Sequence, residues 1–387
     1  MTRTEATLES DTKASPTLLW PLPHLRFSMV GTMPVPRAIL AMARMLRHAP
    51  RLAAGLTPDD EVLLDAPDER LAPALVAAGR GDHGPAAKLL AASRESAEWE
   101  NRDRYTVRLA AFARSRPEWF DLWTASSPYD PDVALVRAEL AVRRGWESPA
   151  RSELLRDVAP LVATAAEGNP GDPVPWRVAL DHARGTGAPH EDFARLWSEA
   201  VRRSPHHYGC HTAALQYLSA AWYGSHRECF RFAELAAADA LPGSLVQALP
   251  VRAALALLLD TDPGTGRAGE PPASGPVGRD RLEAAADLAI ALSTAYEAGD
   301  PHPAEVRNVL TYVLVRLGRW QDALEQLRLI GPHATSFPWD RVSDDPLGQF
   351  LALRDGVRLQ VASATPLRGG PGPGARKHSD TVDAHYS

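Results

Sequence analysis

The sequence predicts an all-α protein, a right-handed α-solenoid in which antiparallel helix hairpins stack side by side. Three observations predict this fold class. Capping residues followed by proline recur before runs that are rich in Ala, Leu, Val and Arg. Glycines followed five residues later by a small residue recur between those runs. No run alternates between apolar and polar residues as a half-buried strand does, so we expect no substantial sheet.

Proline preceded by a capping residue marks five predicted helix starts. The side-chain oxygen of the cap accepts a hydrogen bond from an amide of the first turn, and proline at the first helical position loses no hydrogen bond. The five pairs are Thr57-Pro58, Asp130-Pro131, Asp172-Pro173, Ser204-Pro205 and Asp300-Pro301. We expect a helix to begin at each pair.

Four glycines indicate the turns within the hairpins. Gly81, Gly145, Gly224 and Gly318 are followed by Ala86, Ala150, Cys229 and Ala323. Glycine ends a helix readily in the left-handed conformation, and a small residue one turn into the next helix lets two helices approach closely. Each glycine therefore predicts the end of one helix and the start of its partner.

Composition divides the chain into five parts. Residues 1–56 are predicted to form an irregular N-terminal arm with one amphipathic helix, at 38–46, and residues 57–259 the helix-hairpin array. Residues 260–280 are rich in Gly and Pro and predict a flexible loop. Residues 281–362 predict C-terminal hairpins that continue the array, and residues 363–387 a disordered tail.

Charge and composition exclude several classes of protein. The chain has 42 Lys and Arg against 48 Asp and Glu, with both signs interspersed, which argues against nucleic acid or an anionic membrane as the partner. Two cysteines are too few for a disulfide framework. The first nineteen residues lack the order of a secretory signal, and no stretch approaches the roughly 18 apolar residues of a spanning helix. We expect a cytoplasmic protein.

The segment "PHHYGCHTAALQYLSAAWYGSHREC" (205–229) holds four of the thirteen histidines and both cysteines. His207 and His211 stand four residues apart, which on a helix puts both rings on one face, and His226 or Cys229 is the further ligand that a metal site needs. A hairpin explains the same residues. A helix would run from the Ser204 cap to Tyr223, Gly224 would stop it, and Ser225 with Glu228 would form a capping box for the next helix.

Geometry separates the two ends of that segment. Fifteen residues of continuous helix between His211 and His226 span roughly 22 Å, so all the donors cannot meet at one ion. Two interpretations stay open. In the first, His207 and His211 bind a metal with a third ligand from elsewhere. In the second, His206 and His207 lie in an exposed first turn while His211, Leu215 and Leu218 face the core. We favour the second, and predict no metal and no cofactor.

Other catalytic patterns are not supported. Ser225 lacks the G-x-S-x-G elbow of a hydrolase, neither cysteine lies in a C-x-x-C motif, and the glycines near Gly264 lack the Lys-Ser/Thr of a phosphate loop. The acidic pairs 59–60 and 344–345 suit helix capping and solvation better than acid–base catalysis. We predict no catalytic residue.

Two segments resemble the tetratricopeptide repeat. "LGRWQDALEQLRLI" (317–330) is similar to its turn and second helix, and "FARLWSEAVRRSP" (193–205) to its second helix and terminating proline. Phe193, where the family prefers a small residue, is a departure, and residues 71–93, 133–155 and 211–236 are weaker copies. The glycines do not keep a strict period, so the resemblance is to a degenerate array.

A second resemblance covers about residues 130–355. The motif "PHHYGCHTAALQY", with the later "FPW" (337–339), resembles an uncharacterised family of helical proteins from high-GC bacteria. That resemblance implies a helical architecture and no particular activity.

Four tryptophans beside loop signals are candidates for a partner-binding patch, since aromatic side chains are enriched at interfaces. These are Trp99, Trp119, Trp123 and Trp339. A satellite core under a long loop explains them equally well.

The function predicted from this architecture is a non-catalytic protein–protein or peptide interaction scaffold. The alternative is a helical metalloprotein or enzyme that uses His207 and His211. A third hypothesis is a pocket for an apolar small molecule within the superhelix.

Overall fold

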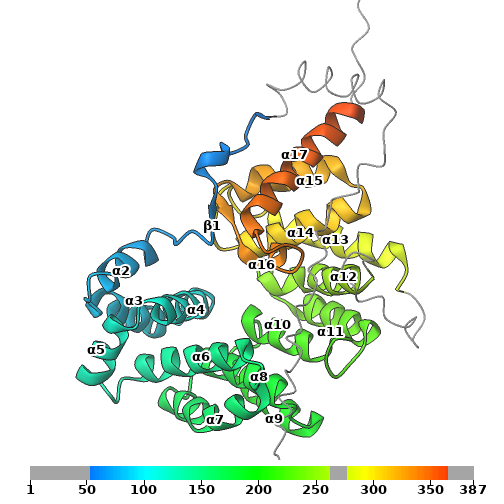
Figure 1. The fold of residues 1–387 in the computed structure, drawn as a ribbon. Helices are drawn as coiled ribbons and strands as arrows, with labels where there is room; N and C mark the ends of the chain where they lie inside the picture. Colours follow the sequence, from blue (N-terminus) through cyan, green and yellow to red (C-terminus); the bar gives the residue numbers. More distant parts are fainter. Residues whose placement is uncertain (1–52, 262–276, 365–387) are drawn as a thin grey trace, which may run out of the picture.

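The computed structural model describes residues 53–261 and 277–364. Within these ranges the chain forms sixteen α-helices, two 3-10 helices and two strands of two residues each. The fold is therefore all-helical, as predicted (Figure 1). The predicted helix at 38–46, nearly all of the predicted arm, most of the predicted loop and the tail beyond residue 364 lie outside the described residues.

The first helices pack mainly against their neighbours in sequence. They are α2 (Leu71–Ala78), α3 (Gly84–Glu95), α4 (Trp99–Ser115), α5 (Glu118–Ser126), α6 (Pro131–Glu147), α7 (Arg151–Gly168), α8 (Val174–Thr186) and α9 (His190–Arg203). Helix α6 contacts both α4 and α7, and α8 contacts both α7 and α9. Three separate apolar clusters fill the contacts along this part of the chain.

The remaining helices share one larger apolar cluster. They are α10 (Tyr208–Tyr217), α11 (His226–Asp239), η2 (Leu245–Ala248), α12 (Leu249–Asp260), α13 (Arg279–Ser293), α14 (Ala304–Leu317), α15 (Trp320–Ile330), α16 (Ser336–Trp339) and α17 (Pro346–Ala364). Helix α14 is buried nearly all round because it contacts α12, α13, α15 and α16.

The start of the described chain returns to its end. After η1 (Asp59–Glu61), strand β1 (Leu63–Leu64) pairs in parallel with β2 (His333–Ala334). Figure 1 shows this blue segment beside the orange C-terminal helices, from which the chain crosses to α2. Val62 belongs to the C-terminal apolar cluster, so the crossing segment is packed as well as hydrogen-bonded.

Two of the predicted local signals are confirmed in detail. Asp130 caps α6 through a hydrogen bond from the Asp132 amide, with Pro131 as the first helical residue. Ser225 caps α11 as predicted by accepting a hydrogen bond from the Glu228 amide, while the Glu228 carboxylate accepts from the Ser225 hydroxyl and not from the Ser225 backbone N–H of a full capping box. Both caps depend on residues within three positions of one another, so the sequence alone suffices to identify them.

Several predicted helix boundaries are wrong. Asp300-Pro301 is followed by a turn, because α14 begins only at Ala304. Thr57-Pro58 precedes only the three residues of η1, and Ser204-Pro205 lies in a turn before α10, which begins at Tyr208 and ends at Tyr217. Gly145 does not end a helix but lies inside α6, where an added Cβ would stand 2.6 Å from Leu155 Cδ2. Because it has no side chain, Gly145 allows α7 to approach α6 closely.

Among the described residues, no helix combines the length and apolar character needed to cross a membrane.

Candidate functional site

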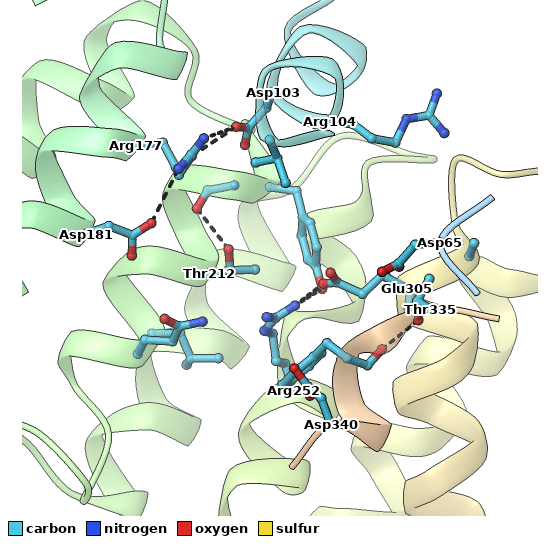
Figure 2. Close-up of a pocket in the computed structure, with 18 of the residues that line it drawn as sticks. Asp65, Asp103, Arg104, Arg177, Asp181, Thr212, Arg252, Glu305, Thr335 and Asp340 are labelled. Carbon is cyan, nitrogen blue, oxygen red and sulfur yellow. Dashed lines mark hydrogen bonds and ion pairs between the residues drawn. The ribbon is translucent and has the colours of Figure 1, made fainter. Parts of the chain in front are cut away.

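A central cavity of about 1010 Å³ lies between the two halves of the chain. Side chains from α4, α6, α8, α10, α12 and α14 line it, together with the segment after β1 and the segment around α16 (Figure 2). The pairing of β1 with β2 holds the segment after β1 against the segment around α16, so these two segments close the cavity on one side. The lining combines many charged side chains with about as many apolar ones, so the cavity offers both polar and apolar contacts to a ligand.

Arg177 of α8 organises the first wall of the cavity. Its Nη2 donates to Asp103 at 2.6 Å, and Asp181 lies 3.5 Å from its Nη1 (Figure 2). Its Nη1 also donates to Glu139 at 2.6 Å. Burial by itself lowers the pKa of Arg177, but the three carboxylates outweigh it and raise that pKa. Burial tends to raise the pKa of Glu139, yet Arg177 and Arg143 hold it below its usual range. This wall is a fixed network of ion pairs.

Arg252 of α12 organises the opposite wall. It forms an ion pair with Glu305 of α14, lies 3.4 Å from the Tyr208 hydroxyl and stacks on the Phe337 ring with its Cζ 4.4 Å from the ring centroid. Burial raises the pKa of the nearby Asp340 carboxyl, and the negative charges of Asp65 and Glu305 add to that rise. Figure 2 shows these carboxylates grouped around Arg252, away from Arg177.

Aromatic rings and arginines meet at one end of the cavity. Trp146 of α6 and Trp222, in the segment after α10, contact edge to face with centroids 5.2 Å apart. Arg151 and Arg184 both lie within 5.1 Å of these two rings. Contacts of this kind stabilise a guanidinium group without neutralising its charge.

His207 is buried beside the first wall rather than exposed as expected. Only 1% of the residue is accessible. The neutral ring caps α10 by accepting a hydrogen bond at Nδ1 from the Cys210 amide, and the protonated ring, which carries a hydrogen on Nδ1, gives up this bond. Its Nε2 lies 3.8 Å from Asp103 and 4.0 Å from Glu100. Burial lowers the pKa of His207, but Cys210 and these carboxylates outweigh it and raise the pKa to about 10.

The Cys210 thiol lies 3.1 Å from His207 Nδ1, as in a cysteine–histidine pair. The thiol is nonetheless fully buried and donates toward the Pro173 carbonyl at 3.6 Å. Burial raises its pKa, whereas a cysteine nucleophile needs a lowered pKa and access to substrate. The pair therefore has a structural role at the start of α10.

His211 faces different neighbours from His207. Its ring packs edge to face on Trp197 at 5.0 Å and lies against Phe232, beside a second pocket of about 500 Å³. Burial lowers the pKa of His211 to about 4. His211 faces the core as expected, among neighbours that differ from those of His207.

Neither His226 nor Cys229 joins the other two histidines. His226 lies 3.3 Å from Asp260, and Cys229 donates toward the Leu215 carbonyl at 3.4 Å. In residues 53–261 and 277–364, no group of three or more His, Cys, Asp or Glu side chains is arranged to hold a metal ion.

Burial removes three of the four tryptophans from the candidate partner-binding patch. Trp119 and Trp123 are 1% accessible and stack within the cluster of α2–α6, and Trp339 is fully buried with its Nε1 donating to Asn308 at 2.9 Å. Trp99, at the start of α4, is partly buried. The satellite-core interpretation describes the three buried rings, and they cannot form an exposed patch in this structure.

The cavity itself was not identified from sequence. Its residues come from nearly the whole described chain, and no local motif links Asp103 of α4 to Arg177 of α8. Comparison of the chain with protein-family models, with curated proteins and with solved structures gave no match.

Proposed function

We propose that the protein is a non-catalytic recognition protein that binds a segment of a protein or a peptide in its central cavity. The observation that carries the proposal is the lining of that cavity, where guanidinium, carboxylate and aromatic groups from both halves of the chain face a space of about 1010 Å³. Such groups, fixed by ion pairs like Arg177–Asp103, are the donors and acceptors by which polar chains are recognised.

We also infer that the helices form a right-handed α-solenoid of antiparallel hairpins, similar to tetratricopeptide repeats. Successive pairs of neighbouring helices in extensive contact, such as α6 with α7 and α14 with α15, support this arrangement. The left-handed Gly318 between α14 and α15 is the turn that the repeat resemblance implies. A cytoplasmic location, without nucleic acid or membrane as a partner, completes the proposal.

A peptide-display screen tests the proposed recognition. A random peptide library is panned on the purified full-length chain, and the enriched peptides are synthesised and titrated by calorimetry. Ala256→Trp fills the cavity from α12, and Ala238→Trp on the exposed face of α11 is the matched control. We expect the control to bind like wild type and the cavity variant to bind at least about tenfold more weakly.

The screen has two results that would overturn the proposal. One is the absence of any peptide enriched above the library background. The other is equal binding of the enriched peptides to wild type and Ala256→Trp, with circular dichroism melts that show both proteins folded. Thr212→Phe, which fills the cavity from α10, replaces Ala256→Trp if that variant does not fold.

A further inference from the structure

Two arginines share one pair of tryptophans at the cavity wall. The Cζ of Arg184 lies 4.2 Å from the Trp146 centroid and 5.0 Å from that of Trp222. The Cζ of Arg151 lies 4.9 Å and 5.1 Å from the same two centroids. All four residues line the cavity. Two positive charges are thus held near the same rings, although like charges repel.

The charge of Arg151 is not neutralised by the described protein. Arg184 donates to Asp181 at 3.0 Å, whereas the side chain of Arg151 forms no ion pair or hydrogen bond with the described residues and contacts the two rings. The Nε atoms of both arginines are buried without a partner. Arg151 is also the first residue of the eighteen-residue α7, where the helix dipole is positive and disfavours a cation.

Close packing of neighbouring helices holds the Trp146 ring in place. Gly185 of α8 lies where an added Cβ would stand 2.2 Å from Leu155 Cδ1 and 3.0 Å from Trp146 Cζ2. Gly145 of α6 makes the corresponding approach to Leu155. The two glycines bring α6, α7 and α8 together, so the rings that orient both arginines are held by tightly packed backbone.

The geometry points to an oxyanion subsite: Arg151 and Arg184, oriented by Trp146 and Trp222, take a carboxylate or phosphate group of the ligand. An oxyanion between the guanidinium groups would supply the missing counter-charge and accept from their unused N–H donors. This assignment rests on the proposed function only in placing the ligand within the central cavity. It adds that the bound segment carries an anionic group at the α7 end of the cavity.

Small anions test the subsite without any peptide. Full-length ¹⁵N-labelled protein is titrated at constant ionic strength with sodium phosphate and, separately, with sodium glutarate, while the indole N–H signals of Trp146 and Trp222 are followed by NMR. Trp146→Phe and Trp222→Phe assign those signals. We expect saturable shifts of both signals. Arg151→Gln should weaken the binding about tenfold or more, and Arg144→Gln, an exposed neighbour on α6, should not.

The outcomes are distinct. Saturation by phosphate alone or by glutarate alone supports the subsite and identifies the anionic group that it prefers. Unmoved indole signals with both anions, or equal affinity of Arg151→Gln and wild type, would overturn it. Because the peptide screen uses neither probe, failure of that screen leaves these shifts intact, and failure of the shifts leaves peptide binding intact.

Discussion

Ser336 donates its backbone N–H to the Asp65 carboxylate at 3.0 Å, across 271 residues of sequence. Arg108 of α4 donates to the same carboxylate at 2.5 Å. Asp65 therefore links three parts of the chain: the segment after β1, the start of α16 and the first helices. This link and the pairing of β1 with β2 hold in place the residues that line the central cavity after β1 and around α16.

Replacing Asp65 by Asn should weaken that link. Asn tolerates the left-handed conformation that Asp65 adopts, with φ of 54°, so the change removes charge without new backbone strain. We expect a loss of about 1–3 kcal/mol in the free energy of unfolding at pH 7, measured by urea titration. Asp60→Asn, at an exposed position of η1, is the matched control and should change it by less than about 0.5 kcal/mol.

At acidic pH, the difference in free energy of unfolding between wild type and Asp65→Asn should disappear. Burial raises the pKa of Asp65, but Arg108 and Ser336 outweigh it and lower that pKa below 3.8. A lowered carboxyl pKa stabilises the fold above 3.8, and the stabilisation disappears as the pH falls through the folded value. Equal stability of the two proteins at pH 7 would contradict the role given to Asp65.

Loss of the buried Arg102 side chain should lower the free energy of unfolding more than loss of an arginine from an exposed ion pair. Its Nε donates to Asp172 at 2.5 Å and its Nη2 to Asp132 at 2.6 Å, and all three side chains are at most 1% accessible. Arg102→Met would leave two buried carboxylates short of a partner. We expect a loss of roughly 3–5 kcal/mol in the free energy of unfolding, measured with urea.

An exposed arginine on the same helix provides the control for Arg102. Arg114 of α4 pairs with Glu147, and both side chains are about half exposed. Arg114→Met should therefore cost less than about 1 kcal/mol. Similar losses for the two variants would show that burial does not set the cost of breaking these pairs.

Local chemistry made part of this structure predictable from sequence. The caps at Asp130 and Ser225 and the left-handed Gly318 follow from residues a few positions apart, and each is confirmed. The all-helical fold follows from many such signals together. Gly145 shows the limit, because a glycine that ends a helix and one that admits a neighbouring helix have the same sequence signature.

Long-range contacts were not predictable in the same way. Trp119 and Trp123 stand beside loop signals, but whether α2 and α3 cover them depends on packing that no short segment encodes. The cavity likewise needs the crossing from β1 to α2, and nothing near Leu63 indicates that it pairs with His333. His207 was expected to be exposed. The expectation was wrong because the ring is buried next to Glu100 and Asp103 of α4, which is far away in sequence.

Protonation of His207 should make stability depend on pH. Its pKa is raised from 6.5 to about 10, so the stabilisation is complete below about pH 6.5 and is lost as the pH rises through about 10. His207→Asn keeps a good helix cap while removing the imidazole. We expect the difference in free energy of unfolding between wild type and this variant to shrink from pH 6.5 to 10, measured with urea at each pH.

His211 gives a control of opposite sign. Burial lowers its pKa to about 4, so the unfolded chain binds a proton more readily and stability is lost as the pH falls from 6.5 toward 4. His211→Asn should therefore reduce the acid sensitivity of the protein and leave the alkaline range unchanged. A pH-independent difference between wild type and His207→Asn would contradict the raised pKa.

Alanine at Gly185 and at Gly356 should change stability in opposite directions. Gly356 lies inside the nineteen-residue α17, where alanine is intrinsically better by roughly 0.5–1 kcal/mol, and Gly185 lies in the last turn of α8. A Cβ at Gly356 of α17 meets nothing within 4 Å, so Gly356→Ala should gain about that amount. A Cβ at Gly185 collides with Leu155 and Trp146, so Gly185→Ala should lose about 1–3 kcal/mol despite the better propensity. Urea unfolding of both variants measures the two changes, and a gain at Gly185 would mean that α6, α7 and α8 are packed less closely than their contacts require.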